Sequence, residues 1–407
     1  MAVHLRRNRD FTLLWSGELV STLGSQMSLV AFPLLVLALT GSPAKAGVVG
    51  FAKTVPALLF YLPAGVLVDR HDRKIIMVAS NAIGAIALGS IPVALALGHL
   101  PFAQIIAVAF VQGTVGALFT LTEQGALPLV VEPAQVPAAL ASNEARRTSA
   151  SLVGPPLGGV LFGIDRVLPF IADSVSYLVS AVSLLFLRTP LQEPRAPTPL
   201  RLFAEIAEGV RALWALTFVR ASALAVAAAN LIWSGLNIVL VVRAQEHGAS
   251  AASIGVLFAL MGVGGVLGSL AAPAIGRRVS VPVIVIGAFW VEAALVASFA
   301  LTYDPYVLGV LAAIAMFPAP AWNAVVVGAR LTLTPDRLRG RVNSAARLLS
   351  ASLVPLGALA GGLLVTATGT TTTLLLFSAW QVVFAVAALS ARSLRNAQPI
   401  VATAHAS

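Results

Sequence analysis

The sequence contains no cysteine and only five histidines among its 407 residues. A chain without cysteine forms no disulfide, no thiolate metal site and no cysteine nucleophile. The nucleotide-binding loop G-x-x-x-x-G-K-[ST] and the hydrolase motifs H-E-x-x-H and G-x-S-x-G are missing as well. We therefore expect a protein that is not an enzyme and that has no catalytic residues, no metal site and no cofactor.

Charged residues are also scarce, at 10% of the chain, whereas hydrophobic residues make up 58%. Soluble domains average about 25% charged and about 45–50% apolar residues, so this composition favours a protein that crosses a membrane many times. A bilayer core about 30 Å thick requires about 20 mostly apolar residues per helix. Twelve such runs can be traced, at residues 11–39, 46–68, 75–97, 102–126, 139–163, 167–187, 217–242, 251–272, 281–302, 306–329, 343–367 and 371–391.

The net charge of +10 does not require a nucleic-acid partner, because the basic residues follow the connections between the predicted helices. Of the 26 Lys and Arg residues, 22 lie in the two tails, the central linker and alternate turns. Cytoplasmic segments of membrane proteins are enriched in Lys and Arg. The distribution predicts cytoplasmic termini and an even number of crossings. The other four basic residues are Lys45, Lys53, Arg166 and Arg243.

The longest polar interval, residues 188–216, divides the predicted helices into two groups of six. It opens with four prolines and continues as an amphipathic segment, whose apolar face comprises Leu202, Ile206, Val210 and Leu213. We expect a cytoplasmic linker with an interfacial helix at 189–216. It joins an N-terminal bundle at 1–188 to a C-terminal bundle, with a short cytoplasmic tail, at 217–407.

The second half of the chain repeats short patterns of the first. The pattern N-x-A-x-R at 143–147 recurs at 343–347, and the paired basic residues at 73–74 recur at 277–278. Two matches at nearly one offset indicate that a six-helix unit occurs twice. Such repeats are a known transporter architecture, in which the substrate site lies near the bilayer midplane.

The segment GVLVDRHDRK, residues 65–74, concentrates charge between two apolar runs. It resembles the signature that transporters of the major facilitator superfamily carry between their second and third helices. The matching positions are Gly65, Asp69, Arg70, Arg73 and Lys74, with Asp72 where a glycine is usual. That departure, and the opening RNRDFTLLWSGELVSTLG, resemble the branch of macrolide-efflux proteins and enterobactin exporters. The resemblance covers essentially the whole chain and implies an all-α membrane protein with twelve helices in two pseudo-symmetric six-helix bundles.

The resemblance also implies that Asp69 belongs to a gate that holds the two halves closed on the cytoplasmic side. The carboxylate can pair with Arg73 or with a neighbouring helix, and the family places it opposite the start of the eleventh helix, near Asn343. For Arg70 and Lys74 the alternative is that they only set the topology of a solvated turn.

Two further residues complete the expected gate, together with Asp72 in the charged turn. Glu123 lies near the end of the fourth predicted helix, and we expect it to pair with Arg73 or Arg147. Such a gate has to break when the protein changes state, so contacts of moderate strength suit it.

The segment GPPLGG, residues 154–159, resembles the fifth-helix motif of drug/proton antiporters through Gly154, Pro155, Gly158 and Gly159. Pro155 and Pro156 lack backbone donors and are expected to kink the helix. Gly158 and Gly159 permit close helix contact. The alternative is ordinary helix packing, because Pro and Gly are frequent in membrane helices.

Ionisable residues inside membrane spans are costly and are candidates for function. Such residues are Glu18, Lys53, Glu123 and Glu292, whereas we expect Asp173 to be structural. The resemblance implies that helices 1, 4, 7 and 10 line the cavity, which favours Glu18 and Glu123 over Glu292. Related exporters often carry an Asp at the position of Ser25, and we expect Glu18 to replace it as the proton-coupling group. The alternative for Glu18 is a paired carboxylate without a transport role.

Polar and aromatic residues on the same four helices are candidates for the substrate cavity. Asn230, Trp233 and Asn237 share one helix face by their spacing. Together with residues of the first and tenth runs, the predicted lining comprises Gln26, Phe32, Asn230, Trp233, Asn237, Trp322 and Asn323. An apolar, aromatic cavity with few polar groups suits an amphiphilic ligand.

These observations predict a secondary transporter that exports a small amphiphilic molecule, such as a drug, a macrolide-like or a siderophore-like compound, by alternating access. We expect the proton gradient to drive it, with no cofactor. The expected partners are the substrate and the lipid bilayer, without nucleic acid, and the expected state is a monomer in a bacterial-type inner membrane. The alternatives are a metabolite uniporter or symporter, a membrane sensor or scaffold that does not transport, and least of all a membrane enzyme.

Overall fold

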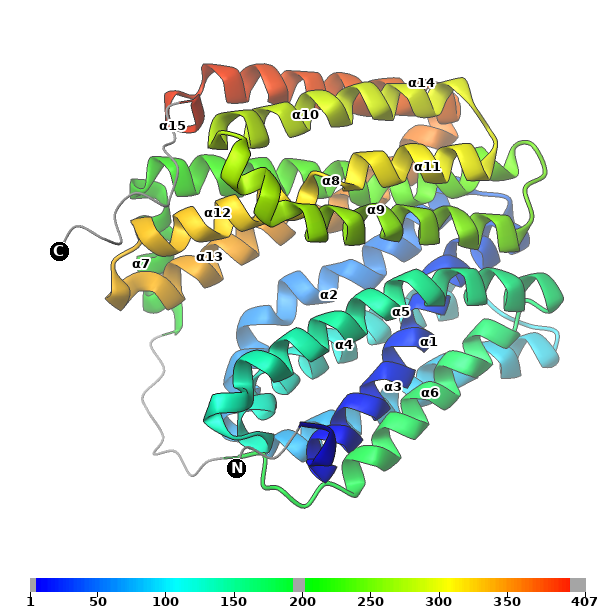
Figure 1. Cartoon of the computed structure of the whole chain (residues 1–407). Coiled ribbons are helices and arrows are strands. Elements are labelled where there is room, and N and C mark those ends of the chain that lie inside the picture. Colours follow the sequence, from blue (N-terminus) through cyan, green and yellow to red (C-terminus); the bar gives the residue numbers. More distant parts are fainter. Residues whose placement is uncertain (1–4, 193–201, 396–407) are drawn as a thin grey trace. The chain divides into compact units, whose positions relative to one another are not determined.

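The computed structural model describes the backbone of residues 5–192 and 202–395, without the side chains of residues 6, 61–66, 69 and 202–206. Every regular element in these described ranges is a helix (Figure 1). Nine helical segments within them are long and apolar enough to cross a membrane. One of these, Asp336–Ser390, contains two of the predicted runs, and α2 and α5 also have spanning length, so the described helices are consistent with twelve crossings.

The chain divides into two compact units, of which unit 1 comprises Met1–Thr198 and Ala249–Ala259. Within it, α1 packs against α5 and α6, α2 against α4, and α3 against α6. Its elements in the described ranges are η1 (Leu5–Arg7), α1 (Arg9–Thr40), α2 (Pro43–Arg70), α3 (Arg73–Ala96), α4 (Phe102–Val130), η2 (Pro133–Gln135), α5 (Val136–Ile164) and α6 (Leu168–Leu185).

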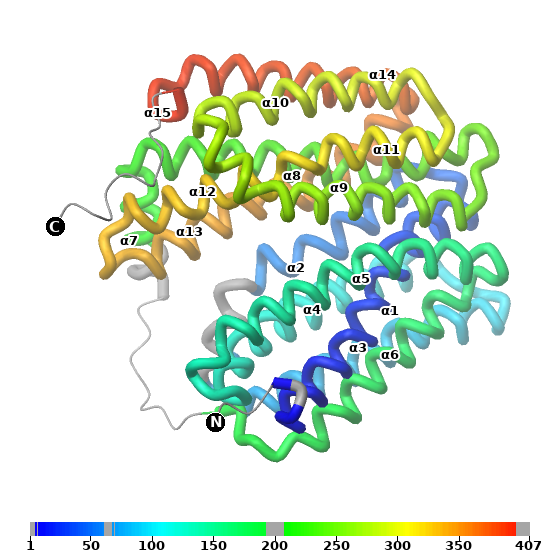
Figure 2. The backbone as a smooth tube through the Cα atoms, viewed as in Figure 1, coloured from blue at the N-terminus to red at the C-terminus, as the bar shows by residue number. Residues whose placement is uncertain are grey.

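Unit 2 comprises Pro199–Gly248 and Leu260–Ser407, and α9 continues into it from unit 1. In this unit α14 packs along both α8 and α10, and α10 lies beside it in Figure 2. Its described elements are α7 (Leu202–Ala215), α8 (Thr217–Gln245), α9 (Ala251–Arg278), α10 (Val281–Ser298), η3 (Phe299–Leu301), α11 (Pro305–Met316), α12 (Ala319–Leu333), η4 (Asp336–Leu338), α13 (Arg339–Ala351), α14 (Val354–Ser390) and α15 (Arg392–Arg395).

Two predicted runs differ from the structure because proline interrupts them. The run at 306–329 forms α11 and α12, with a break at Phe317 and Pro318. The run at 343–367 forms α13 and α14, and Pro355 stands at the second position of α14. Proline is tolerated in a first helical turn but lacks the N–H needed farther inside a helix, so each of these helices begins anew beside its proline.

The connection between the last two runs is very tight. Helical hydrogen bonding extends across α14, but Gly369 inside it has φ 79° and ψ 168°. This backbone conformation is accessible almost only to glycine. Gly369 therefore ends one helix and starts the next without a loop, where the sequence predicted a break at 368–370.

The amphipathic segment after the linker forms α7, which packs against α8 and α13. Leu213 is buried, whereas Val210 is 40% exposed. An exposed apolar side chain is what an interfacial helix presents to the membrane surface, so the interfacial helix stays a prediction. Gly209 lies against the backbone of Arg341, and Glu208 pairs with the Arg341 guanidinium. The side chains of Leu202 and Ile206 lie outside the described residues.

Arg243, one of the four basic residues outside the topology pattern, is fully buried at the end of α8. Its guanidinium lies 3.4 Å from the ring centroid of Tyr303 and donates to the carbonyl oxygens of Thr302 and Ala300. It also donates to the hydroxyls of Thr370 and Thr371, beside Gly369. This arginine therefore joins α8, η3 and the middle of α14, which explains why it does not follow the positive-inside pattern.

Candidate functional site

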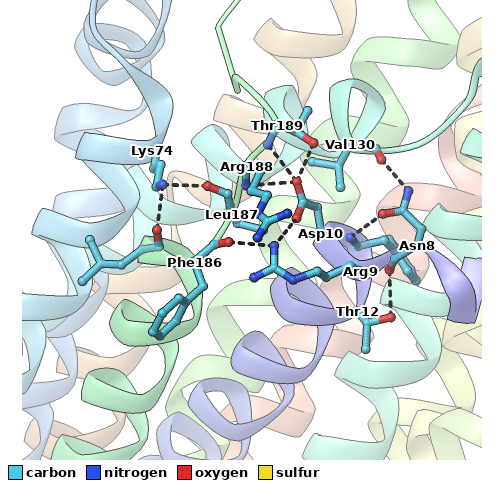
Figure 3. Close-up of polar contacts among 12 residues, drawn as sticks. Asn8, Arg9, Asp10, Thr12, Lys74, Val130, Phe186, Leu187, Arg188 and Thr189 are labelled. Atoms are coloured by element: carbon cyan, nitrogen blue, oxygen red, sulfur yellow. Dashed lines mark hydrogen bonds and ion pairs between the residues drawn. The ribbon is translucent and has the colours of Figure 1, made fainter.

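Two basic residues of the GVLVDRHDRK segment, Arg73 and Lys74, bind backbone carbonyl oxygens of other helices of unit 1. Lys74 Nζ donates to the carbonyl oxygens of Leu185 and Leu187, at 2.9 and 2.8 Å, at the end of α6 (Figure 3). Arg73 is buried, and its Nη1 donates to the carbonyl oxygen of Gly125 in α4 at 2.8 Å. Cations near helix C-termini satisfy carbonyls that have no helical partner. Both residues therefore do more than set topology.

The acidic member of this turn that is described, Asp72, is the N-cap of α3. Its carboxylate accepts from the backbone N–H groups of Lys74 at 2.7 Å and Ile75 at 3.3 Å. A carboxylate at this position satisfies free donors of the first helical turn, which gives a structural reason for Asp72 where the related signature has glycine. Arg70 is exposed at the end of α2, while Gly65 and the side chain of Asp69 lie outside the described residues.

Asp10, in the first turn of α1, binds the same end of α6. Its Oδ2 accepts from the backbone N–H groups of Arg188 and Thr189 and from the Thr189 hydroxyl, at distances of 2.6–3.1 Å (Figure 3). Arg9 donates to the carbonyl oxygen of Phe186 in the same cluster. The start of the chain and the end of α6 are thus fixed to each other, a contact that the sequence did not indicate.

A polar cavity of about 260 Å³ lies inside unit 1. Four helices supply its ionisable and hydroxyl-bearing walls, and it contains the predicted residues Glu18, Glu123 and Arg147. The lining comprises Glu18, Ser21, Thr22, Ser25, Asn81, Gly116, Phe119, Thr120, Glu123, Arg146, Arg147 and Tyr177.

Glu18 is buried at one wall of this cavity and is held by a short hydrogen-bond chain. Ser180 Oγ of α6 donates to Glu18 Oε1 at 3.0 Å, and Asn81 Nδ2 of α3 donates to Ser180 Oγ at 2.7 Å. The charges of Glu123, Arg146 and Arg147 are close enough to act on this carboxyl group. A buried carboxyl group next to other charges is a candidate for proton transfer.

Glu123 pairs with Arg146 rather than with Arg73 or Arg147, so the predicted pairing is wrong. Arg146 Nη2 lies 2.8 Å from Glu123 Oε1, and their side chains are only 2% and 9% exposed. Asn143 Nδ2 donates to the same oxygen at 3.1 Å. Arg146 is buried on the inner face of α5, whereas the next residue, Arg147, is exposed and contributes to the cavity lining.

The glycines of the GPPLGG segment form a contact surface on α5, which is continuous through Pro155 and Pro156. Gly154 lies against Leu23 and Gln26 of α1, and Gly158 lies against the backbone of Met27. Gly159 faces Ala251 at the beginning of α9, in the segment that belongs to unit 1. A side chain at these positions would separate the helices.

We expect Gly158→Ala to lower the stability of the protein by about 1–3 kcal/mol, as overpacking does in other cores. An added Cβ would lie 2.6 Å from the carbonyl oxygen of Met27, whereas one at Gly163, a turn farther along α5, would have no atom within 4 Å. Gly163→Ala is therefore the matched control and should keep the wild-type melting temperature. Equal melting temperatures for the two variants would show that α1 and α5 do not pack this closely.

Two of the predicted cavity residues lie elsewhere in unit 1. Phe32 is buried and meets Phe170 edge to face at 5.2 Å, with Lys53 Nζ 5.3 Å from its ring centroid. Gln26 lies at the contact of α1 with Gly154. Neither residue lines the polar cavity of unit 1. Asp173, which we expected from the sequence to be structural, is buried nearby and accepts a hydrogen bond from Ser28.

A second cavity of about 340 Å³ lies inside unit 2 and contains the other five predicted lining residues. Asn230, Trp233 and Asn237 approach it from α8, and Trp322 and Asn323 approach it from α12. Asn230 Nδ2 also donates to the carbonyl oxygen of Ser350 at 2.8 Å. The full lining comprises Val226, Ala229, Asn230, Trp233, Asn237, Met261, Ala288, Phe289, Glu292, Met316, Ala319, Trp322 and Asn323.

The sequence favours Glu18 and Glu123 over Glu292, yet the structure places Glu292 in the wall of this second cavity. Its Oε2 accepts from Gln381 Nε2 of α14 at 2.7 Å, and Trp233 lines the same cavity. The available signal was an acidic residue inside a long apolar run. The expectation that helices 1, 4, 7 and 10 line the cavity favours other residues over Glu292.

Neither cavity has the ligand set of a metal site. Among the described residues, no group of three or more His, Asp and Glu side chains is arranged to hold a metal ion. One cavity is polar and carries charges of both signs, and the other is mainly apolar and aromatic with one carboxyl group. The first arrangement suits proton exchange, and the second suits the binding of an amphiphilic molecule.

Known proteins with similar sequences carry the names of efflux proteins. The multidrug efflux pump Tap of Mycolicibacterium fortuitum is 27% identical over 397 residues, covering 94% of this chain and 96% of that protein. Macrolide efflux protein A of Streptococcus pyogenes is 25% identical over 181 residues, which is 44% of this chain and 45% of that protein.

Solved structures of transporters share the fold at low sequence identity. A bacterial homologue of the human lysosomal transporter Spinster, in an inward-facing and unoccupied conformation, has a TM-score of 0.74 at 16% identity, with 95% of this chain and 98% of that chain covered. The nucleoside transporter NupG has a TM-score of 0.74 at 14% identity, with 95% and 99% covered.

The family described as transmembrane secretion effectors matches residues 4–405, which is almost the entire chain. This match and the structural likeness agree with the two-unit helical architecture described above. The protein is thus a multi-pass membrane transporter with the major facilitator fold, and it belongs to the transmembrane secretion effector family of the major facilitator superfamily.

Proposed function

We propose that this protein exports small amphiphilic molecules from the cytoplasm, as a secondary active transporter that works by alternating access. The observation that carries the proposal is the cavity of about 340 Å³ in unit 2, with aromatic and aliphatic walls and few polar groups. Such sites bind amphiphilic ligands, because apolar walls bury most of the ligand and a few polar groups orient it. The names of the related multidrug and macrolide efflux proteins support export rather than uptake.

Proton entry powers the export in this proposal, and no cofactor takes part. Glu18 is the coupling group. It is buried in the polar cavity of unit 1 and lies near the charges of Glu123, Arg146 and Arg147. An ion gradient drives transport when protonation of such a group favours one conformation over the other. The substrate leaves chemically unchanged, so the protein is not an enzyme.

The proposed setting is the inner membrane of a bacterial-type cell, with both termini in the cytoplasm and the protein acting as a monomer. The clustering of basic residues in alternate connections supports this orientation. The proposed halves are residues 1–188 and 217–407, joined by the linker at 189–216. In this scheme Gly65, Asp69 and Arg70 remain members of a cytoplasmic gate, together with the Glu123–Arg146 pair.

Everted membrane vesicles test the proposal. Vesicles that contain the protein should accumulate a fluorescent amphiphile such as ethidium when they are energised, and a protonophore should abolish the accumulation. Vesicles without the protein are the control. Accumulation that persists after the proton gradient has collapsed would contradict proton-driven export.

The same preparation separates export from the two rival functions. A uniporter would show counterflow in both directions without any gradient, and a sensor or scaffold would move no substrate. The natural absence of cysteine permits a further check. Single cysteines at Asn237 and Asn323, which line the cavity, should react with a water-soluble maleimide only if the cavity opens to water.

A further inference from the structure

The cavity of unit 2 has one feature that the proposed export of amphiphiles does not use, which is a buried acidic group. Among the described residues that line the cavity, Glu292 is the one with an ionisable side chain. It is 7% exposed and accepts a hydrogen bond from a neutral partner, the Gln381 amide, at 2.7 Å. The ion pairs found among the described residues do not include it.

An ionised carboxylate inside an apolar cavity is costly unless a cation compensates it. In the unit 1 cavity, Glu123 is compensated by Arg146 at 2.8 Å, and the charges of Arg146 and Arg147 also lie near Glu18. No corresponding basic residue belongs to the described lining around Glu292. The missing positive charge is therefore one that a ligand can bring.

The side chains around Glu292 are those that receive an organic cation. Trp233, Phe289 and Trp322 line the same cavity, and the rings of Phe289 and Trp322 meet at nearly a right angle, with centroids 6.3 Å apart. Aromatic faces attract ammonium and related cations, most strongly where water is excluded. Met261 and Met316 add polarisable surface that adapts to ligands of different shape.

We infer that the unit 2 cavity binds a monovalent, amphiphilic organic cation, with its positive charge on the Glu292 carboxylate and its apolar groups between the aromatic side chains. The inference rests on the proposed function for its biological sense, but binding itself does not depend on transport. It assigns Glu292 as the residue that selects cationic over neutral ligands. The neutral asparagines, Asn230, Asn237 and Asn323, then contribute orientation rather than charge selection.

A binding experiment on the purified full-length protein tests the inference. Trp233 and Trp322 line the cavity, so quenching of tryptophan fluorescence reports occupancy. The probes are tetraphenylphosphonium, a permanent lipophilic cation, and triphenylphosphine oxide, a neutral compound with similar aryl groups. The variants are Glu292→Gln, which removes the charge but keeps the shape, Glu292→Asp, which keeps the charge, and the exposed control Glu132→Gln.

The expected result is that Glu292→Gln weakens tetraphenylphosphonium binding by about tenfold or more, which corresponds to about 1.4 kcal/mol. Triphenylphosphine oxide should bind to this variant as it does to the wild type, and that result also shows that the variant is folded. Glu292→Asp should retain most of the cation preference, and Glu132→Gln should behave as the wild type.

Three results would overturn the inference: a wild-type protein that does not bind the cation, a Glu292→Gln variant that binds it with unchanged affinity, and a variant that loses both probes equally. The failure of the proposed function looks different. Charge-selective binding that depends on Glu292, in a protein that exports nothing from everted vesicles, would support the inference and refute export.

Discussion

Replacing Glu18 by glutamine is expected to abolish the dependence of export on the proton gradient. Glutamine keeps the size of the side chain and an oxygen that accepts from Ser180, so the chain from Asn81 through Ser180 persists. It removes the exchangeable proton. The ratio of export rates with and without an inward proton gradient should fall to about one. A proton shifts the equilibrium between two conformations only where it binds one of them more tightly than the other, and the variant has lost this binding group.

Glu18 is the favoured coupling group because of its charged surroundings. It shares the polar cavity of unit 1 with a second acid, Glu123, and with two arginines, Arg146 and Arg147. Both acids are acted on by the Arg146 charge, but only Glu123 is in direct contact with it. Glu18 is therefore the acid whose charge is less compensated, and the one that can gain and lose a proton without breaking an ion pair.

The matched control for this variant is Glu144→Gln, an exposed acid on α5 outside the cavity lining. Initial rates of ethidium efflux should be measured in vesicles at several external pH values. The wild type and Glu144→Gln should respond to the gradient, and Glu18→Gln should move substrate only down its own concentration gradient. A Glu18→Gln protein with the wild-type response would assign coupling to another group.

Replacing Arg146 by methionine is expected to destabilise the protein by about 3–5 kcal/mol, the usual cost of leaving a buried charge without its partner. The variant leaves Glu123 with Asn143 as its remaining contact on Oε1. The double variant Arg146→Met, Glu123→Leu should recover most of the loss, because apolar residues of similar size replace buried ion pairs at little cost. Its export activity should stay low if the pair also serves the gate.

The neighbouring arginine supplies the control for this pair. Arg147→Met removes the same charge one residue along the chain, at a position that is exposed rather than buried. Its stability should stay within about 0.5 kcal/mol of the wild type, as for most surface substitutions. Thermal unfolding of the purified proteins compares the wild type with these three variants. A stable Arg146→Met, or a double variant no better than the single one, would show that the Glu123–Arg146 contact is not a structural ion pair.

Hydropathy predicted the helices well because lipid imposes a single strong requirement. Every backbone polar group inside the bilayer has to be bonded within a helix, so long apolar runs have few alternatives. The exceptions lie where proline removes a donor, as at Pro318 and Pro355, and where Gly369 permits a turn without a loop. Hydropathy averages over these single residues and therefore does not detect such breaks.

Side-chain partners could be predicted only in part. Spacing on α8 correctly brought Asn230, Trp233 and Asn237 to one cavity. The partners of Arg73 and Lys74 are backbone carbonyls 52 to 118 positions away in sequence. Backbone atoms carry no sequence signal, so such contacts stay invisible until the helices are packed.

The two units resemble each other in how they hold a buried acid. In unit 1, polar side chains of α3 and α6 form the chain that reaches Glu18 of α1. In unit 2, α10 packs against α14 as α3 packs against α6 in unit 1, and Gln381 of α14 donates a hydrogen bond to Glu292 of α10. The repeat seen in sequence thus has a counterpart in polar contacts, but the acid lies on a different helix in each half. We interpret this difference as a division of labour, with proton exchange in one half and cation binding in the other.

The central claim, that proton entry drives substrate out of the cytoplasm, is tested most directly with the purified protein in sealed proteoliposomes. A pH gradient is imposed across the membrane, and the movement of ethidium and the internal pH are followed together. Substrate should move against the direction of proton flow, should reverse when the gradient is reversed, and should dissipate the gradient faster than in liposomes without substrate. Substrate movement that ignores the sign of the gradient, with no substrate-dependent proton flux, would contradict the claim.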